Sequence, residues 1–179
     1  MTRSTVSRSL HDVGLAAWFG GTLANAVALN PASGHASSPA DSGQVANTGW
    51  NRWTPVNAAA IAMHVAGSVG QLSSNKTRLA AQPGVGTMAV VKTAVTAAAL
   101  GVTAYSRVLG RQVAAHTDVP VDSATSPAAA TPPEVAAAQK QLAVLQWAVP
   151  ALTGTLVVIS SFAGEQQRPA SVLRNLLTS

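Results

Sequence analysis

Charged residues are absent from long stretches of the chain, and this pattern determines the elements that the sequence predicts. The gaps between successive Asp, Glu, Lys and Arg residues include 13–40, 53–75, 79–106 (interrupted only by Lys92) and 141–164. A helix that spans a bilayer needs roughly 17 to 25 mostly apolar residues, so each gap can hold one. The pattern therefore predicts four transmembrane helices, at about 12–30, 54–73, 87–108 and 141–163.

Two segments between these helices are rich in residues that form turns. Residues 31–52 contain many Gly, Pro, Ser and Asn and are predicted to be a loop. Residues 117–133 are rich in Pro, Ala, Ser and Thr and are predicted to be extended, although Pro133 suits a helix start. The tail, 165–179, is predicted to hold a short amphipathic helix. The fold class is thus all-α: one membrane domain, 1–179, with a four-helix bundle and long Pro/Ala/Ser-rich outer loops.

Polar residues recur at intervals of seven within the predicted helices. Residues seven apart lie on nearly the same side of a helix, because two turns take about 7.2 residues. The polar stripe that results consists of His11, Asn25, Asn57, His64, Gln71, Lys92, Gln146, Thr153 and Ser160. Lipid cannot satisfy polar side chains, so these residues are expected to face one another inside the bundle. Such an arrangement stabilises helix packing and requires no ligand.

His64 is the candidate functional residue of this stripe. One hypothesis is a neutral imidazole that hydrogen-bonds to Thr, Ser or Gln of the third or fourth helix. The other is a site for haem, metal or proton chemistry, since ionisable residues inside membranes are often functional. Pairing with His11 is not expected, because the predicted spans put the two residues at depths that differ by roughly 15 Å, at 1.5 Å per residue.

The other candidates carry weaker signals. Lys92 is expected to reach the headgroups, or alternatively to be buried against polar residues of the bundle. His35 and His116 fall in the two outer loops without a nearby acidic cluster, which is a poor metal signal. The sequence contains no HExxH, phosphate-loop or GxSxG motif. It therefore predicts no catalytic residue, no metal site and no cofactor, and the protein is not expected to be an enzyme.

Composition agrees with a membrane location. Of 179 residues, 47% are hydrophobic and only 9% are charged, against about 25% charged in ordinary soluble domains. The net charge is +5, but the Lys and Arg residues are scattered and form no basic stripe, so no nucleic-acid partner is expected. The absence of cysteine excludes disulfides and thiolate sites. An Ala-rich soluble bundle stays open as an alternative, because the second segment is only weakly hydrophobic.

The distribution of cations predicts the orientation of the chain. With the amino terminus inside, the cations on or near the inner side are Arg3, Arg8, Lys76, Arg78, Lys92, Arg168 and Arg174. Those outside are Arg52, Arg107, Arg111 and Lys140. The excess inside predicts a multi-pass protein of the cell membrane with both termini in the cytoplasm. Alternatively, the first helix is a cleaved signal peptide, because Ala26 to Ala28 resembles a cleavage site.

Three stretches carry a resemblance to a known family. They are "HDVGLAAWFGG" (11–21), "LQWAVPALTG" (145–154) and "GEQQRP" (164–169). These stretches resemble small four-helix integral membrane proteins of actinobacteria, a family without an assigned activity. The first stretch is also similar to copper-resistance domains, but the ligands of those domains are not matched, so the resemblance implies no metal role.

Two functions follow from this pattern. The first is a structural or accessory component that packs in the bilayer as a homo-oligomer or with a membrane protein partner. The alternative is a small transporter, or a haem or metal carrier, that uses the polar stripe around His64. Trp50 and Trp53 are assigned to the aromatic belt at the outer membrane surface.

Overall fold

The chain folds into long helices, and a small two-stranded hairpin connects the last two of them. The computed structural model describes residues 2–74, 83–116 and 118–165. Its elements are, in order, α1 (Thr2–Ala24), the π-helix η1 (Asn25–Leu29), α2 (Asn30–Ser33), α3 (Pro39–Ser74), α5 (Pro83–Ala114), β1 (Val121–Ser123), β2 (Ser126–Pro127) and α6 (Pro133–Glu165). The predicted all-α class is confirmed for the described residues.

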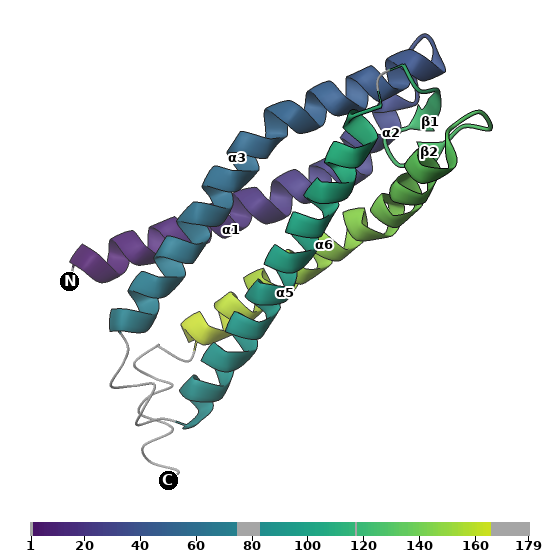
Figure 1. The fold of residues 1–179 in the computed structure, drawn as a ribbon. Helices are drawn as coiled ribbons and strands as arrows, with labels where there is room; N and C mark the ends of the chain where they lie inside the picture. The colour runs from purple at the N-terminus through teal and green to yellow at the C-terminus, as the bar shows by residue number, and fades with distance from the viewer. Residues whose placement is uncertain (1, 75–82, 117, 166–179) are drawn as a thin grey trace.

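The long helices pack in the order α3, α1, α6, α5. Helix α1 packs along α3 on one side and against α6 on the other, and α5 packs along α6. Helices α3 and α5 therefore lie at the two ends of the row and share no extensive contact. Figure 1 shows two helix pairs, α1 with α3 and α5 with α6, that approach each other near β1 and β2 and diverge toward the other end. We call the first of these the hairpin end.

The predicted loop at 31–52 is wrong over most of its length, because α3 begins at Pro39. The hydroxyl of Ser38 accepts a hydrogen bond from the Asp41 N–H at 3.2 Å and donates one to the Asp41 carboxylate at 2.8 Å. This is a helix cap, followed by Pro in a favourable position. Gly, Ser and Asn have weak helix propensity, and the close contact of Gly49 with the side chain of Leu29 shows that tertiary packing supports the helix here.

The other elements also extend beyond their predicted bounds. Helix α1 begins at Thr2 instead of near residue 12, and α5 covers Pro83–Ala114 instead of 87–108. Helix α6 begins at Pro133, where the sequence suits a helix start, and runs past the predicted 141–163. The predicted loop at 117–133 contains the antiparallel β1–β2 hairpin. The predicted amphipathic tail, apart from its first residue, lies outside the described residues.

Three helical stretches are long and apolar enough to cross a membrane. Within the described residues they are Thr5–Ser33, Gly86–Ala114 and Pro133–Ala163. The expected crossing at 54–73, within α3, does not reach this hydropathy, because Asn57, His64 and Gln71 lower the mean of the segment. The structure is thus compatible with a membrane-embedded protein by length and composition, and a fourth crossing stays a prediction.

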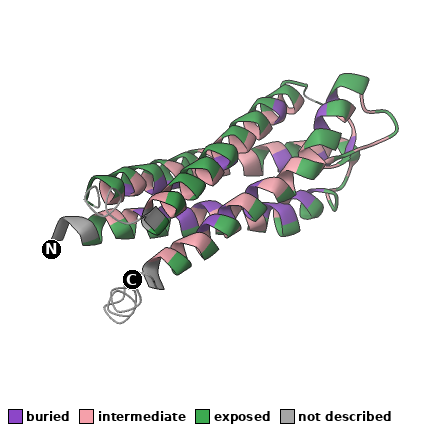
Figure 2. Ribbon diagram, turned by 90° about the horizontal axis from the view of Figure 1, so that it is seen from below, coloured by how far each residue is buried: buried purple, intermediate pink, exposed green. Residues whose placement is uncertain are grey.

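The core forms where one residue from each long helix meets around Trp18. The indole of Trp18 is fully buried and packs in a cluster with Ala60 of α3, Ala99 of α5 and Val149 of α6. Three of the four residues are small or medium in size, so the indole fills the centre of the bundle. Figure 2 shows buried positions at intervals along the helices, with exposed positions covering their outer faces.

Glycines set the distance between α1 and α3. A Cβ placed on Gly14 would lie 2.5 Å from both the carbonyl oxygen of Ala60 and the backbone nitrogen of His64. A Cβ on Gly67 would meet the backbone of His11 and the carbonyl oxygen of Ser7. Backbone atoms cannot move aside as flexible side chains can, so both positions require glycine at the observed helix separation.

The substitution Gly67→Ala is expected to push α1 and α3 apart and to lower the stability of the folded protein. The expected loss is about 1–3 kcal/mol, typical of overpacking, measured by thermal or denaturant unfolding in detergent. Gly101→Ala is the matched control, because a Cβ there meets nothing within 4 Å. Equal stability of the two variants would contradict the close α1–α3 packing.

Candidate functional site

The residues of the predicted polar stripe differ in their burial. His11, Asn25, His64 and Thr153 are buried. The half-buried members are Asn57, Gln71, Lys92, Gln146 and Ser160. The hydroxyl of Thr153 donates to the carbonyl of Val149 in its own helix at 2.8 Å. The stripe is divided by Trp18, with the histidines on the side away from the hairpin and Asn57 and Gln146 on the hairpin side.

His11 and His64 lie side by side, and the expectation that they are at different depths is wrong. Their ring centroids are 4.5 Å apart, and His64 Nδ1 lies 3.4 Å from the carbonyl oxygen of His11. The earlier start of α1 explains the difference, because His11 lies nine residues from that start (11 − 2) and His64 lies ten residues from the end of α3 (74 − 64). His64 therefore faces α1, and not the Thr, Ser or Gln residues of the later helices.

A cavity of 340 Å³ lies between α3 and α5, the two outer helices of the row, on the hairpin side of Trp18. Its apolar wall includes Ile61 of α3, Leu100 of α5 and Leu145 of α6. Ile61 and Leu100 also pack against the Trp18 cluster, which therefore forms the floor of the cavity. The volume falls in the range of about 300–1,000 Å³ that is usual for small-molecule sites. We call this cavity the α3–α5 pocket.

The side chain of Asn30 joins three elements at the edge of this pocket. Its Nδ2 donates to Gln146 Oε1 of α6 at 2.7 Å, and its Oδ1 accepts from Trp50 Nε1 of α3 at 3.0 Å. Asn30 follows η1, where its backbone N–H bonds to the carbonyl of Asn25, five residues earlier. A π-helical turn of this kind shifts the register of the helix, and such turns are frequent at functional sites.

Polar atoms without partners line the wall of the α3–α5 pocket. Among the described residues, the buried atoms that lack a hydrogen bond and belong to lining residues are Trp53 Nε1, Asn57 Oδ1, Thr103 Oγ1, Arg107 Nε and Gln139 Oε1. Buried polar atoms in native proteins are nearly always hydrogen-bonded, and leaving one unsatisfied costs about 1–3 kcal/mol. Their gathering around one apolar cavity points to a partner from outside the chain.

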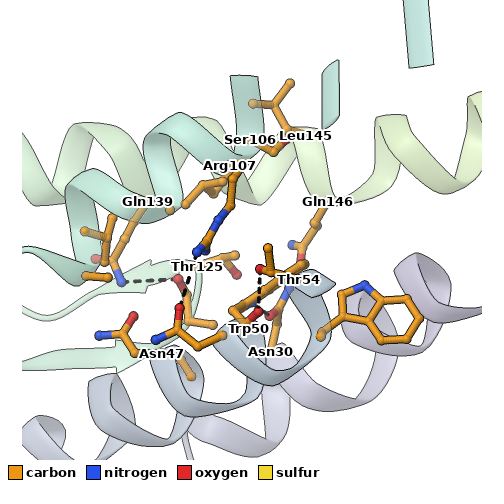
Figure 3. Close-up of a pocket in the computed structure, with 18 of the residues that line it drawn as sticks. Asn30, Asn47, Trp50, Thr54, Ser106, Arg107, Thr125, Gln139, Leu145 and Gln146 are labelled. Carbon is orange, nitrogen blue, oxygen red and sulfur yellow. Dashed lines mark hydrogen bonds between the residues drawn. The ribbon is translucent and has the colours of Figure 1, made fainter. Parts of the chain in front are cut away.

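Arg107 gives the pocket its charge. Among the described lining residues it is the one with a permanent charge, and none is Asp or Glu. Its Nη2 donates a long hydrogen bond of 3.4 Å to Asn51 Oδ1. The close histidine–carboxylate contacts His11–Asp12 and His116–Glu134 do not involve it. Figure 3 shows Arg107 extending from α5 toward the polar side chains of α3.

The pocket contains residues that sequence reasoning assigned to other roles. Trp50 and Trp53 line it, although they were assigned to an aromatic belt. Arg107 was counted only as an outer cation, although a single Arg next to a long uncharged stretch is a signal that could have drawn attention to it. His116 lines the pocket and His35 is exposed. In the described chain, no group of three or more His, Cys, Asp or Glu side chains could hold a metal ion.

Comparisons with known proteins add no assignment. No family model matches the chain, and no curated protein or solved structure is significantly similar to it.

A double-mutant cycle tests the junction at Asn30. Asn30→Ala and Gln146→Ala each remove one partner of the 2.7 Å hydrogen bond, so their effects on unfolding free energy should not add. The expected coupling is about 1 kcal/mol or more, within the range for residues in contact, measured by denaturation of the two single variants and the double variant in detergent. Additive effects would show that this hydrogen bond does not join α2 to α6.

Proposed function

We propose that this chain is a membrane protein that binds an amphipathic small molecule with an anionic head group in the α3–α5 pocket. The observation that carries the proposal is the placement of Arg107, whose buried Nε lacks a partner, at a cavity whose wall is mostly apolar. An apolar cavity favours a hydrocarbon group, and an arginine without a carboxylate partner favours a carboxylate or phosphate. Together they match an amphipathic anion.

The exposed surface of the helices supports the membrane location in this proposal. Large apolar side chains that are more than half exposed include Val90 and Val108 on α5 and Val144, Val158 and Phe162 on α6. Such side chains are unfavourable in water and favourable against lipid. We place the protein in the cell membrane as a multi-pass protein with α3 as a fourth crossing and both termini in the cytoplasm, which puts the hairpin end outside.

The ligand in this proposal lies along the pocket with its head group toward the hairpin end. The head would accept hydrogen bonds from Arg107, and Asn51 and Gln139 are close enough to the same region to act as further polar contacts. The hydrocarbon part would contact Ile61 and Leu100 above the Trp18 cluster. The role that we propose is binding or carriage without catalysis.

The competing hypothesis is the structural or accessory component that the sequence favours, which packs with itself or with a membrane partner. In that hypothesis the polar stripe is satisfied by the facing helices. The partnerless atoms of Asn57, Thr103 and Arg107 favour the ligand-binding hypothesis instead, because helix packing leaves them unsatisfied. A binding experiment can distinguish the two.

The experiment uses the tryptophans of the pocket as sensors. Dibromostearate quenches tryptophan fluorescence on contact, and Trp50 and Trp53 line the pocket. The side chain of Trp147 is 51% exposed on α6, so a Trp147→Phe background removes quenching from the lipid-facing surface. Saturable quenching is expected, and Arg107→Gln should weaken binding by about 10- to 100-fold, the value of one or two charge-assisted hydrogen bonds.

Two controls make this experiment specific. Arg111→Gln removes a cation one turn away on α5 that does not line the pocket, and it should leave binding unchanged. The methyl ester of dibromostearate lacks the negative charge and should bind more weakly than the acid. Equal quenching by ester and acid, or equal affinity of the Arg107 and Arg111 variants, would contradict the proposal and favour the structural hypothesis.

A further inference from the structure

The two facing imidazoles have the same protonation pattern. His11 Nδ1 lies 2.7 Å from Asp12 Oδ1, and His64 Nδ1 lies 3.4 Å from the carbonyl oxygen of His11. An ionised carboxylate and a carbonyl can only accept hydrogen bonds, so each neutral ring carries its proton on Nδ1. The lone pair is therefore on Nε2 in both rings.

Both Nε2 atoms are buried and have no hydrogen-bond partner in the described chain. The residues themselves are almost fully enclosed, with 1% exposure for His11 and 0% for His64. A buried lone pair without a donor is unfavourable, and here two of them belong to rings in contact. One electron-pair acceptor bound between the two Nε2 atoms would satisfy both.

The distance between the rings restricts what this acceptor can be. A metal–imidazole bond is about 2.0–2.1 Å long, so two imidazoles on opposite sides of an ion have centroids roughly 6 Å apart. The observed 4.5 Å separation and 46° tilt fit neighbouring coordination positions on one ion instead. A haem held between the two rings would need them on opposite sides of its iron, and the observed separation is too short for that.

The groups around the rings are those that orient metal-binding histidines. A carboxylate on one Nδ1 and a backbone carbonyl on the other are the usual second partners of such residues, because they fix the ring and direct Nε2 toward the ion. Asp12 also supplies a negative charge beside the site. The positive charge of Lys92 on α5 acts on both rings and partly offsets the negative charge of Asp12.

We propose that His11 and His64 bind one transition-metal ion of the class that imidazole prefers, such as Zn²⁺, Co²⁺ or Ni²⁺. The two Nε2 atoms occupy adjacent positions, and Asp12 orients His11. The described chain offers no third His, Cys, Asp or Glu ligand, so the remaining coordination positions are filled by ligands from outside the described residues. The site lies on the far side of Trp18 from the α3–α5 pocket and does not depend on the ligand proposed there.

The test is a titration with Zn²⁺ alone. The protein is purified in detergent without a histidine tag, treated with a chelator, and titrated calorimetrically. One ion per chain is expected, and His11→Gln or His64→Gln should weaken binding by about 100-fold or more. His35→Gln and His116→Gln are the matched controls, because their side chains are exposed, and neither should change the affinity.

A second variant covers the case in which the buried histidine variants do not fold. The side chain of Asp12 is 60% exposed, so Asp12→Asn should fold normally, and it should bind Zn²⁺ about tenfold more weakly, as loss of an orienting partner does. The proposal is overturned if the wild-type protein binds no ion at one per chain. It is also overturned if Asp12→Asn binds Zn²⁺ with unchanged affinity, or if His35→Gln or His116→Gln removes the binding.

Discussion

The burial of Trp18 is the interaction on which the arrangement of the helices depends. Its indole forms the core cluster with one residue from each of the other long helices, and two of these, Ala60 and Ala99, are alanines. Alanine offers little side chain to bridge a gap, so the large ring of α1 occupies the centre itself. The glycine contacts then hold α1 close to α3. Helices α3 and α5 share no extensive contact, and the α3–α5 pocket lies between them.

This arrangement separates two polar regions within one bundle. Toward the hairpin end, the amide of Asn30 joins α2, α3 and α6, and the α3–α5 pocket lies beside it. On the other side of Trp18, His11 and His64 are enclosed between α1 and α3. Each region contains buried polar atoms without partners in the described chain, and this shared feature is why both support binding proposals. The polar residues therefore lie in two regions separated by Trp18, and not in one continuous stripe.

The sequence predicts the helices better than their ends or contacts. Uncharged stretches identify the long helices, because long runs without charge are typical of helices that are apolar enough to cross a membrane. The start of α3 at Pro39 was not predictable, since Gly, Ser and Asn favour loops locally and tertiary packing overrides them. The pairing of His11 with His64 was not predicted either, because α1 begins about ten residues earlier than its uncharged stretch indicates. Arg107 carries no local motif, and its role depends on contacts that only folding brings together.

The most direct measurement is an experimental structure of the protein in lipid nanodiscs, with the region between α3 and α5 resolved to side-chain detail. If the pocket binds an amphipathic anion, we expect an elongated density in the α3–α5 pocket, with one end against the guanidinium of Arg107 and the other above the Trp18 cluster. A structure in which α3 packs directly on α5, with Arg107 paired to a carboxylate of the chain and no space between the helices, would contradict it.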